Sequence, residues 1–420
     1  MKQRKSATKK TSKEDKSSGK ETKKITTTET KTKTTTTATA PATTTDAKKA
    51  SLSNLKTRTW TSIVMIALFA AVVYLGHWAC FAVVVFCQVA MFKELENVRT
   101  RGAQTQVQLI SKISNWSFFV AFAWGVTGRV LVITFGEQWL RFGVLGVLLV
   151  RYHTMITYTL YCVAFVAFVL SLRSGHLKEQ FKSFAWTHMI LLVVMLQVNL
   201  WEHTLFKGLF WFVLPASLVI VNDVFAFVFG KLFGRHPLIS LSPHKTWEGF
   251  VGGMLSTFVW GFFLSRLLSR WSWLTCPKTD LFTWGVVCAP DPLFQKQLYT
   301  APAWLLGGFS FHARPVQFHT LVFVLFASLV APFGGFFASG LKRAFGVKDF
   351  DHVIPGHGGV TDRMDCQFLM GSFVNLYYNT FLVHAAAVPA VMDTIIALDN
   401  ESQLEIFTRL ASILNKTILP

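Results

Sequence analysis

Long apolar runs separated by short polar segments form the main pattern of this sequence. A helix rises about 1.5 Å per residue, so about 20 mainly apolar residues are needed to cross a hydrocarbon core of about 30 Å. Runs of this kind recur about nine times after residue 59, which predicts an all-α polytopic integral membrane protein with about nine transmembrane helices. The expected spans are a tight helical hairpin over 60–92, broken at Gly76-His77, followed by 115–135, 153–171, 184–200, 208–229, 249–265, 317–340 and 366–391.

Two parts of this pattern are less regular. Arg129 lies inside the span at 115–135, and the apolar run 142–150 leads up to the span at 153–171. The run 142–150 is either a re-entrant or interfacial piece, or a further span that would raise the count to ten.

The composition excludes two other classes of protein. Hydrophobic residues make up 52% of the chain, aromatic residues 15% and charged residues only 15%, which is not the balance of a soluble enzyme. Six cysteines are ordinary for 420 residues, and Cys80, Cys87 and Cys162 lie inside apolar runs. This usage excludes a secreted disulfide scaffold.

The N-terminal segment has a different composition from the rest. Residues 1–50 contain 14 Lys or Arg against 5 Asp or Glu, together with 16 Thr and no aromatic residue. Such a segment cannot bury enough apolar surface to fold, so we expect residues 1–59 to be a disordered, basic, Lys/Thr-rich cytosolic tail. Its charge is attracted to anionic lipid headgroups, but without an aromatic residue or folded module we expect no nucleic acid partner.

The basic residues between the spans predict an orientation. With a cytosolic N-terminus, the loops 93–114, 172–183, 230–248 and 341–365 face the cytosol and hold 14 Lys or Arg, whereas the opposite loops 136–152, 201–207 and 266–316 hold 8. Positively charged flanks stay in the cytosol, so this bias supports the arrangement. The lumenal loop 266–316 contains Cys276 and Cys288, for which a disulfide is one hypothesis.

The segment 339–365 has the densest candidate chemistry. Its cations are suited to neutralising phosphate oxygens, namely Lys342, Arg343, Lys348 and Arg363. Its carboxylates are hard oxygen ligands suited to Mg²⁺, namely Asp349, Asp362 and Asp365. His357 is suited to positioning phosphate or backbone, and Gly358 and Gly359 permit close approach of a ligand. Charges at the end of a span are often ordinary flanking pairs. A Gly-rich turn followed by Asp-Arg-Met-Asp makes that interpretation improbable.

A second polar segment lies between residues 222 and 253. Asp223 is inside an expected span, where a charge is costly and usually faces a polar cavity, so it either binds metal or pairs with another helix together with Asn222. The residues proposed for substrate binding are Ser242, Lys245, Thr246 and Glu248, placed at a turn or helix start. Gly249, Gly252 and Gly253 follow, and they allow another backbone to come close.

These two segments resemble the signature of the CDP-diacylglycerol synthase (phosphatidate cytidylyltransferase) family, and the Asp-Arg-Met-Asp-Cys-Gln ending resembles its eukaryotic branch. The resemblance covers 222–253 and 339–367 and continues more loosely over the other spans. Three positions depart from the family pattern, namely Asp351, His244 and Phe227, and Asp351 adds a fourth carboxylate to the segment. None of the three removes a residue that the proposed chemistry needs.

The resemblance implies a reaction and a location. CTP and phosphatidic acid, the expected substrates, would give CDP-diacylglycerol and pyrophosphate with Mg²⁺, one or two ions being held by Asp223, Asp349, Asp362 and Asp365. The site would face the cytosol from the endoplasmic reticulum membrane, with the oligomeric state, including a homodimer, left open. The chain then divides into N-terminal transmembrane helices (60–200), a catalytic transmembrane region (201–395) and a short C-terminal amphipathic segment (396–420).

Two other functions remain as alternatives. A CTP-dependent polyprenol or phytol kinase would share the spans and the basic loops but would release CDP. A transporter of anionic solutes would explain buried charge, but it gives no reason for a metal-type set of carboxylates, and the sequence shows no internal repeat.

Overall fold

A computed structural model describes residues 44–100, 106–239, 242–278, 281–282, 288, 291–300, 309–354, 358–383, 392, 395–396 and 398–418. The helices are α1 (Thr44–Leu75), α2 (His77–Thr100), α3 (Gln106–Leu140), α4 (Val144–Arg151), α5 (His153–Leu170), α6 (Leu177–Phe206), α7 (Phe210–Phe233), α8 (Trp247–Leu268), α9 (Ser272–Thr275), α11 (Pro315–Leu329), α12 (Pro332–Ala344), α13 (Thr361–Tyr377) and α15 (Asn400–Ile418). Short 3₁₀ turns lie at Ser174–His176 and Pro292–Phe294, and a π-helical turn lies at Tyr378–Leu382.

Two antiparallel hairpins accompany the helices. Strands β1 (Pro237–Ile239) and β2 (Ser242–Thr246) form the first, and β3 (Gln297–Thr300) and β4 (Ser310–Ala313) form the second. The first hairpin corrects the expectation of a turn or helix start at Ser242, because helix α8 begins only at Trp247. The predicted all-α membrane class is confirmed, since both hairpins are small connections between helices.

The described part of the chain contains seven helical segments long and apolar enough to cross a membrane. They are His77–Arg99, Leu109–Leu140, His153–Leu170, Ser174–Phe206, Phe210–Phe233, Trp247–Leu268 and Pro315–Ala344. A shorter apolar helix covers Thr59–Leu75, and the expected span 366–391 continues into residues that are not described. The total of nine therefore stays a prediction.

The breaks between helices follow local backbone constraints. Gly76 separates α1 from α2 with a positive φ of 94°, a conformation that suits glycine, so the break lies where the sequence predicts it. Pro332 begins α12 after α11 has ended at Leu329, as expected for a residue that cannot continue a helix. Helix α4 has eight residues and is about 12 Å long, too short for a span, which favours the re-entrant or interfacial alternative for 142–150.

The structure bears on the N-terminal segment, on the loop that contains Cys276 and Cys288, and on the C-terminal segment. Helix α1 begins at Thr44, so its first turns extend into the segment 1–59 that was expected to be disordered; a helix extends more easily than it nucleates. The disulfide between Cys276 and Cys288 is present. The C-terminal segment forms α15, and its apolar side chains Leu404 and Phe407 are exposed.

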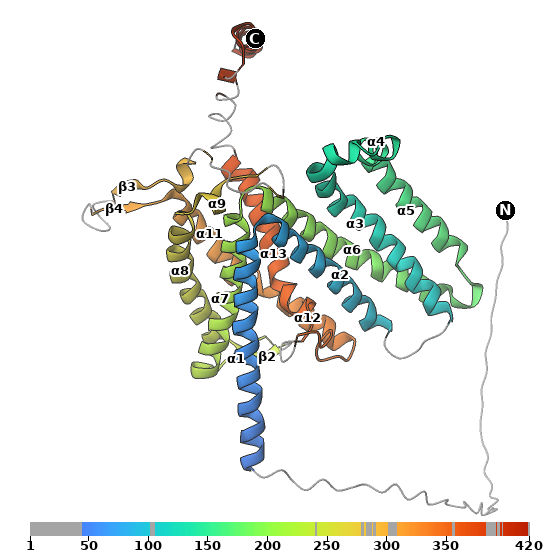
Figure 1. Cartoon of the computed structure of the whole chain (residues 1–420). Coiled ribbons are helices and arrows are strands. Elements are labelled where there is room, and N and C mark those ends of the chain that lie inside the picture. Colours follow the sequence, from blue (N-terminus) through green and yellow to red (C-terminus); the bar gives the residue numbers. More distant parts are fainter. Residues whose placement is uncertain are drawn as a thin grey trace, which may run out of the picture. The chain divides into compact units, whose positions relative to one another are not determined.

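Close packing of aromatic and small residues holds the helices together. Helix α7 packs along α8, which packs on α11, while α3 packs against α5 and α6, and α2 lies on α6 (Figure 1). Phe326 of α11 stacks on Phe373 of α13 with ring centroids 3.9 Å apart. Large apolar side chains such as Trp60 and Leu68 remain exposed on the outer helix surfaces, as expected where lipid replaces water.

Glycines set the distance between α7 and α8. A Cβ atom at Gly249 would lie 2.5 Å from the backbone oxygen of Ala226, and one at Gly253 would lie 2.9 Å from that of Asn222. Asn222 is buried, and its side-chain oxygen accepts a hydrogen bond from the Thr257 hydroxyl at 3.4 Å. The predicted close backbone approach at these glycines is therefore confirmed.

Replacing Gly249 tests this packing. In Gly249→Ala the new methyl group meets the α7 backbone, which cannot move as a side chain can, so we expect the protein to lose about 1–3 kcal/mol of stability. Thermal unfolding of the purified protein in detergent measures the loss. The control is Gly175→Ala, where nothing lies within 4 Å of the added atom. Equal melting temperatures for the two variants would contradict the packing argument.

Candidate active site

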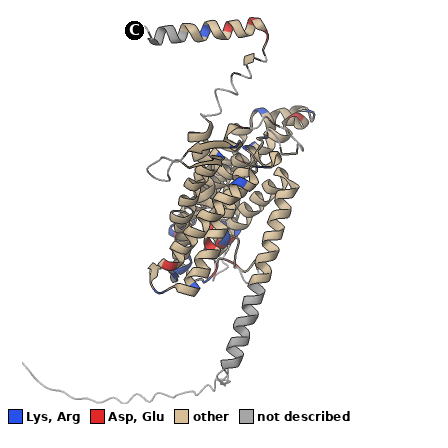
Figure 2. Ribbon diagram, turned by 90° about the vertical axis from the view of Figure 1, so that its left-hand side faces the viewer, with Lys and Arg blue, Asp and Glu red and all other residues tan. Residues whose placement is uncertain are grey.

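The two polar segments lie on neighbouring elements of the bundle. The first segment occupies the end of α7, the β1–β2 hairpin and the start of α8. The second occupies the end of α12, the following loop and the start of α13. Helix α13 packs on both α12 and α7, so the fold brings the segments together. Figure 2 shows that most of the helical ribbon carries no charged residue, which makes such a cluster distinctive.

Two glycines of α12 form the meeting point. A Cβ atom at Gly334 would lie only 2.2 Å from the backbone oxygen of Asp365, so α12 and α13 approach closely there. The next position, Gly335, lies between the segments: its Cβ atom would be 3.5 Å from Asp365 Oδ2 and 3.5 Å from Lys245 Nζ. Since both atoms lie 3.5 Å from the same point, Lys245 Nζ and Asp365 Oδ2 are separated by at most twice this distance. Lys245 also lies 4.4 Å above the ring of Phe336.

Asp223 adds a second carboxylate near the point where the two polar segments meet. It lies about three turns before the end of α7, inside a membrane-spanning segment. The positive charges of Lys245 and Arg363 act on it, and it repels Asp365. A charge at this depth is costly unless other charged groups lie near it, and Lys245 and Arg363 fit that requirement.

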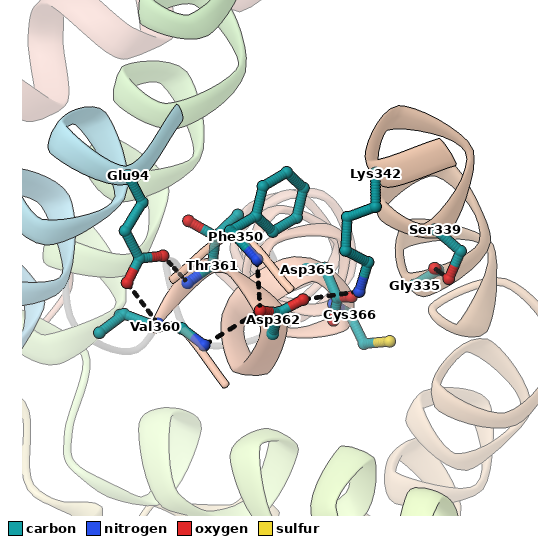
Figure 3. Close-up of polar contacts among 11 residues, drawn as sticks. Glu94, Gly335, Ser339, Lys342, Phe350, Val360, Thr361, Asp362, Asp365 and Cys366 are labelled. Carbon is teal, nitrogen blue, oxygen red and sulfur yellow. Dashed lines mark hydrogen bonds and ion pairs between the residues drawn. The ribbon is translucent and has the colours of Figure 1, made fainter. Parts of the chain in front are cut away.

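Asp362 organises the loop that precedes α13 (Figure 3). Its Oδ1 atom accepts a 2.6 Å hydrogen bond and ion pair from Lys342 Nζ, with the carboxylate side chain only 3% exposed. Its Oδ2 atom accepts from the backbone N–H groups of Phe350 at 3.1 Å and Gly359 at 3.0 Å. One buried carboxylate therefore joins α12, the loop and the first turn of α13, and each of these charge-assisted bonds is stronger than a neutral one.

Gly358 is the point where Asp349 approaches Asp362. Its φ is 81°, and a Cβ atom there would be 3.0 Å from Asp362 Oδ2 and 3.4 Å from Asp349 Oδ1. The backbone N–H of Ile354 donates to the Gly358 oxygen at 2.9 Å and closes the loop. A side chain at position 358 would be strained and would crowd both carboxylates, which explains glycine there.

Glu94 of α2 is a site residue that the sequence analysis missed. Its two carboxylate oxygens accept hydrogen bonds from the backbone N–H groups of Val360, at 2.7 Å, and Thr361, at 2.8 Å (Figure 3). Glu94 is 2% exposed, and its negative charge lies at the N-terminus of α13, where the helix dipole favours it. The available signal was a carboxylate close to the end of a long apolar run, which resembles an ordinary flanking charge.

The first segment contributes structure as well as charge. Thr246 caps α8, its hydroxyl accepting from the Gly249 N–H at 3.2 Å. Glu248 accepts from His236 Nδ1 at 2.6 Å and from the backbone N–H of Arg235 at 3.1 Å, so it holds the chain that leads into β1. Ser242 lies in β2 opposite Ile239.

The remaining predicted residues differ in exposure. Arg343, Lys348 and Arg363 are exposed, and Lys342 is half-buried. His357 lies outside the described residues. Within the described part of the chain, no three His, Cys, Asp or Glu side chains converge as a ready metal site. Instead, Asp223 and Asp365 lie close enough for their charges to repel each other, and Asp349 and Asp362 both border Gly358.

The chain is similar to known proteins over most of its length. Residues 56–381 match the family described as the Cytidylyltransferase family. The chain belongs to this family. It is 45% identical over 368 residues to phosphatidate cytidylyltransferase 1 of Arabidopsis thaliana, covering 85% of this chain and 87% of that protein.

Two further members of the cytidylyltransferase family show similar agreement. The phosphatidate cytidylyltransferase of Saccharomyces cerevisiae is 43% identical over 368 residues, which cover 86% of this chain and 80% of that protein. Phosphatidate cytidylyltransferase 1 of Homo sapiens is 39% identical over 395 residues, which cover 90% of this chain and 84% of that protein. The eukaryotic resemblance seen in the motifs thus extends over most of the chain.

Substituting Glu94 tests its role as the anchor of α13. In Glu94→Gln one acceptor oxygen becomes a donor that faces a buried N–H, so we expect amide hydrogen exchange in residues 358–363 to accelerate about tenfold or more. Mass spectrometry of exchanged peptides measures this effect. The matched control is Glu179→Gln, an exposed residue paired with Lys182. Unchanged exchange in the Glu94 variant would show that these bonds do not hold the loop.

Proposed function

We propose that this chain is a phosphatidate cytidylyltransferase, which converts CTP and phosphatidic acid to CDP-diacylglycerol and pyrophosphate. The observation that supports this proposal most strongly is the meeting of Lys245 with Asp223 and Asp365 inside a membrane helix bundle. Family membership and the printed names of the relatives agree with it. A cation binds phosphate oxygens directly, and two carboxylates would hold a metal ion that does the same, so the group could accommodate a nucleotide and a charged lipid.

The reaction is a nucleotidyl transfer. A phosphate oxygen of phosphatidic acid attacks the α-phosphorus of CTP, the bond from that phosphorus to the bridging oxygen of the β-phosphate breaks, and pyrophosphate leaves. The nucleophile is already an anion, so the main obstacle is repulsion between two polyanions. Fixed positive charge lowers that barrier without a covalent enzyme intermediate. Lys245, Arg363 and the exposed Arg343 and Lys348 supply that charge in this proposal.

The donor set fits Mg²⁺. This ion usually takes one or two protein carboxylates and completes its octahedron with water and substrate phosphate. Asp223 and Asp365 would hold it, because they come from different helices and their negative charges repel each other. When bound, the ion would neutralise charge between the two phosphate groups. Three ready protein ligands are therefore not required.

We assign a positioning role to Asp362. Its oxygens already accept from Lys342 and from two backbone N–H groups, so it keeps Lys342 and the Gly358-Gly359 turn in place. Asp349 lies beside it and could join a second ion if one binds. This division refines the sequence hypothesis, in which all four aspartates hold metal.

We further propose that the site faces the cytosol from the endoplasmic reticulum membrane. The basic loops 230–248 and 341–365 border it, and cytosolic loops are enriched in Lys and Arg. This orientation gives access to soluble CTP, while phosphatidic acid is supplied by the bilayer.

Product analysis tests the proposed reaction. Purified protein in detergent, given labelled CTP with phosphatidic acid and Mg²⁺, should form labelled CDP-diacylglycerol and release pyrophosphate in equal amounts. Omitting either phosphatidic acid or Mg²⁺ should abolish both products. Release of CDP with a polyprenol or phytol acceptor would instead identify the lipid kinase. Solute uptake into vesicles without turnover would identify a transporter.

Substitution of the aspartates separates metal binding from positioning. We expect Asp223→Asn and Asp365→Asn each to lower kcat by about 100-fold or more and to raise the Mg²⁺ concentration needed for half-maximal rate. Asp362→Asn should lower kcat through the loss of the Lys342 ion pair while leaving the Mg²⁺ requirement unchanged. Rate measurements over a Mg²⁺ titration give both values.

A neighbouring aspartate provides the control for these variants. The Asp351 carboxylate accepts a hydrogen bond from the backbone N–H of the next residue, His352. Because this bond is local, the rate of Asp351→Asn should stay within about twofold of that of the unmodified protein. A normal Mg²⁺ requirement in the Asp223 and Asp365 variants would refute their assignment as metal ligands. A raised requirement in Asp362→Asn would return that residue to the metal set.

A further inference from the structure

Three arginines gather at the end of α8 that is distant from the candidate active site. Arg266 lies in the last turn of α8, Arg270 follows the end of that helix, and Arg314 is the N-cap residue of α11. The 22 residues of α8 place this end about 33 Å from Lys245, which is about the thickness of the hydrocarbon core. The arginine cluster therefore belongs to the opposite side of the bilayer from the proposed catalytic chemistry.

Arg314 is the buried member of the cluster. It is only 9% exposed, and its Nη1 group donates a hydrogen bond to the Ser269 hydroxyl. Its Nε group is buried and has no hydrogen-bond partner among the described residues. A buried charged donor without a partner is costly, so this guanidinium group retains a capacity for one more acceptor.

The surroundings of Arg314 are positive. Burial, together with the charges of Arg270 and Arg266, lowers the pKa of Arg314, although a guanidinium group remains protonated at neutral pH. The N-terminus of α11 adds the positive end of a helix dipole. Among the residues that the structure describes, none of the three arginines forms an ion pair with a carboxylate.

Ordinary flanking charges do not explain the whole cluster. Arg266 and Arg270 lie near the C-terminus of α8, where the helix dipole favours cations. Arg314 lies at an N-terminus, where the dipole opposes it, and it is buried rather than free to reach water. An anion shared by the three side chains would relieve all of these costs.

An apolar groove lies on α7 and α8, about one to three turns before Arg266. Its volume is about 440 Å³, and it is lined by Phe225 of α7 and by Leu255, Ser256, Val259, Trp260 and Phe263 of α8. Positions 259, 263 and 266 follow one another at helical spacing, so the groove and Arg266 share a face of α8, and Arg270 follows in the turn after that helix. Exposed Trp271 and Trp273 lie just beyond, as is typical of the membrane–water interface.

We propose that this face of α8 binds an anionic phospholipid of the leaflet opposite the active site. Its phosphate group would lie between Arg266, Arg270 and Arg314, and an acyl chain would occupy the groove that ends at Phe263. Arginine suits this task because its planar donors match phosphate oxygens in bidentate fashion. The proposal does not depend on the reaction that the protein catalyses.

Thermal unfolding of the delipidated full-length protein in detergent tests the proposal. We expect dioleoyl phosphatidylglycerol to raise the melting temperature by a few degrees, and dioleoyl phosphatidylcholine to raise it less, because a ligand that binds only the folded state stabilises it. Titration of phosphatidylglycerol then gives an apparent affinity. In the double variant Arg266→Gln/Arg270→Gln this affinity should fall about tenfold or more.

The matched control removes the same charge elsewhere. Arg141 and Arg151 are exposed and are expected on the same side of the membrane, so Arg141→Gln/Arg151→Gln should keep the affinity of the unmodified protein. All four substituted side chains are exposed, and size-exclusion profiles will confirm that both variants are folded.

The other outcomes decide against the proposal. Equal losses in both double variants would show non-specific charge attraction, and no stabilisation of the unmodified protein would show that the lipid does not bind. If inorganic phosphate alone gives the full stabilisation and the Arg266/Arg270 variant abolishes it, the cluster binds free phosphate, and the assignment to a lipid is wrong.

Discussion

The close approach of α12 to α13 is the constraint on which the rest of the candidate site depends. With Gly334 against the Asp365 backbone, any larger residue would separate the helices. Lys245 would then no longer lie beside Asp365, because Gly335 is the space they share. The N-terminus of α13 is fixed by Glu94, which accepts from N–H groups that a helix start leaves unsatisfied, and Asp362 holds the loop that precedes the helix. Helices α2, α7, α12 and α13 thus meet at one helix terminus.

The sequence predicted the elements of this site better than its contacts. The apolar runs located the membrane helices, and Gly76 marked a break, because length and backbone freedom are local properties. The meeting of the two polar segments was also predictable, since both border spans on the same expected side. The β1–β2 hairpin was not predicted, because Ser-Pro-His-Lys-Thr carries no alternating apolar pattern.

Glu94 and Asp362 show why the remaining contacts were out of reach. Glu94 binds backbone N–H groups more than 260 residues further along the chain, and backbone groups leave no signature in the sequence. Asp362 has the residue type of a metal ligand, but its role depends on which donors surround it. The residue type shows that a carboxylate can bind a metal ion or accept hydrogen bonds. Only the fold shows which donors surround it and therefore which of these roles it has.

The distribution of carboxylates provides the strongest physical argument for a bound cation. Both oxygens of Glu94 and of Asp362 already accept hydrogen bonds, from backbone N–H groups and, for Asp362, also from Lys342. Asp223 and Asp365 differ, because they come from different helices, repel each other and share the charge of Lys245. Two carboxylates held together in this way are costly unless positive charge lies between them. In the proposed reaction, a divalent ion that also binds phosphate would relieve this repulsion when substrate binds, and the order of the site would then depend on occupation by its ligands.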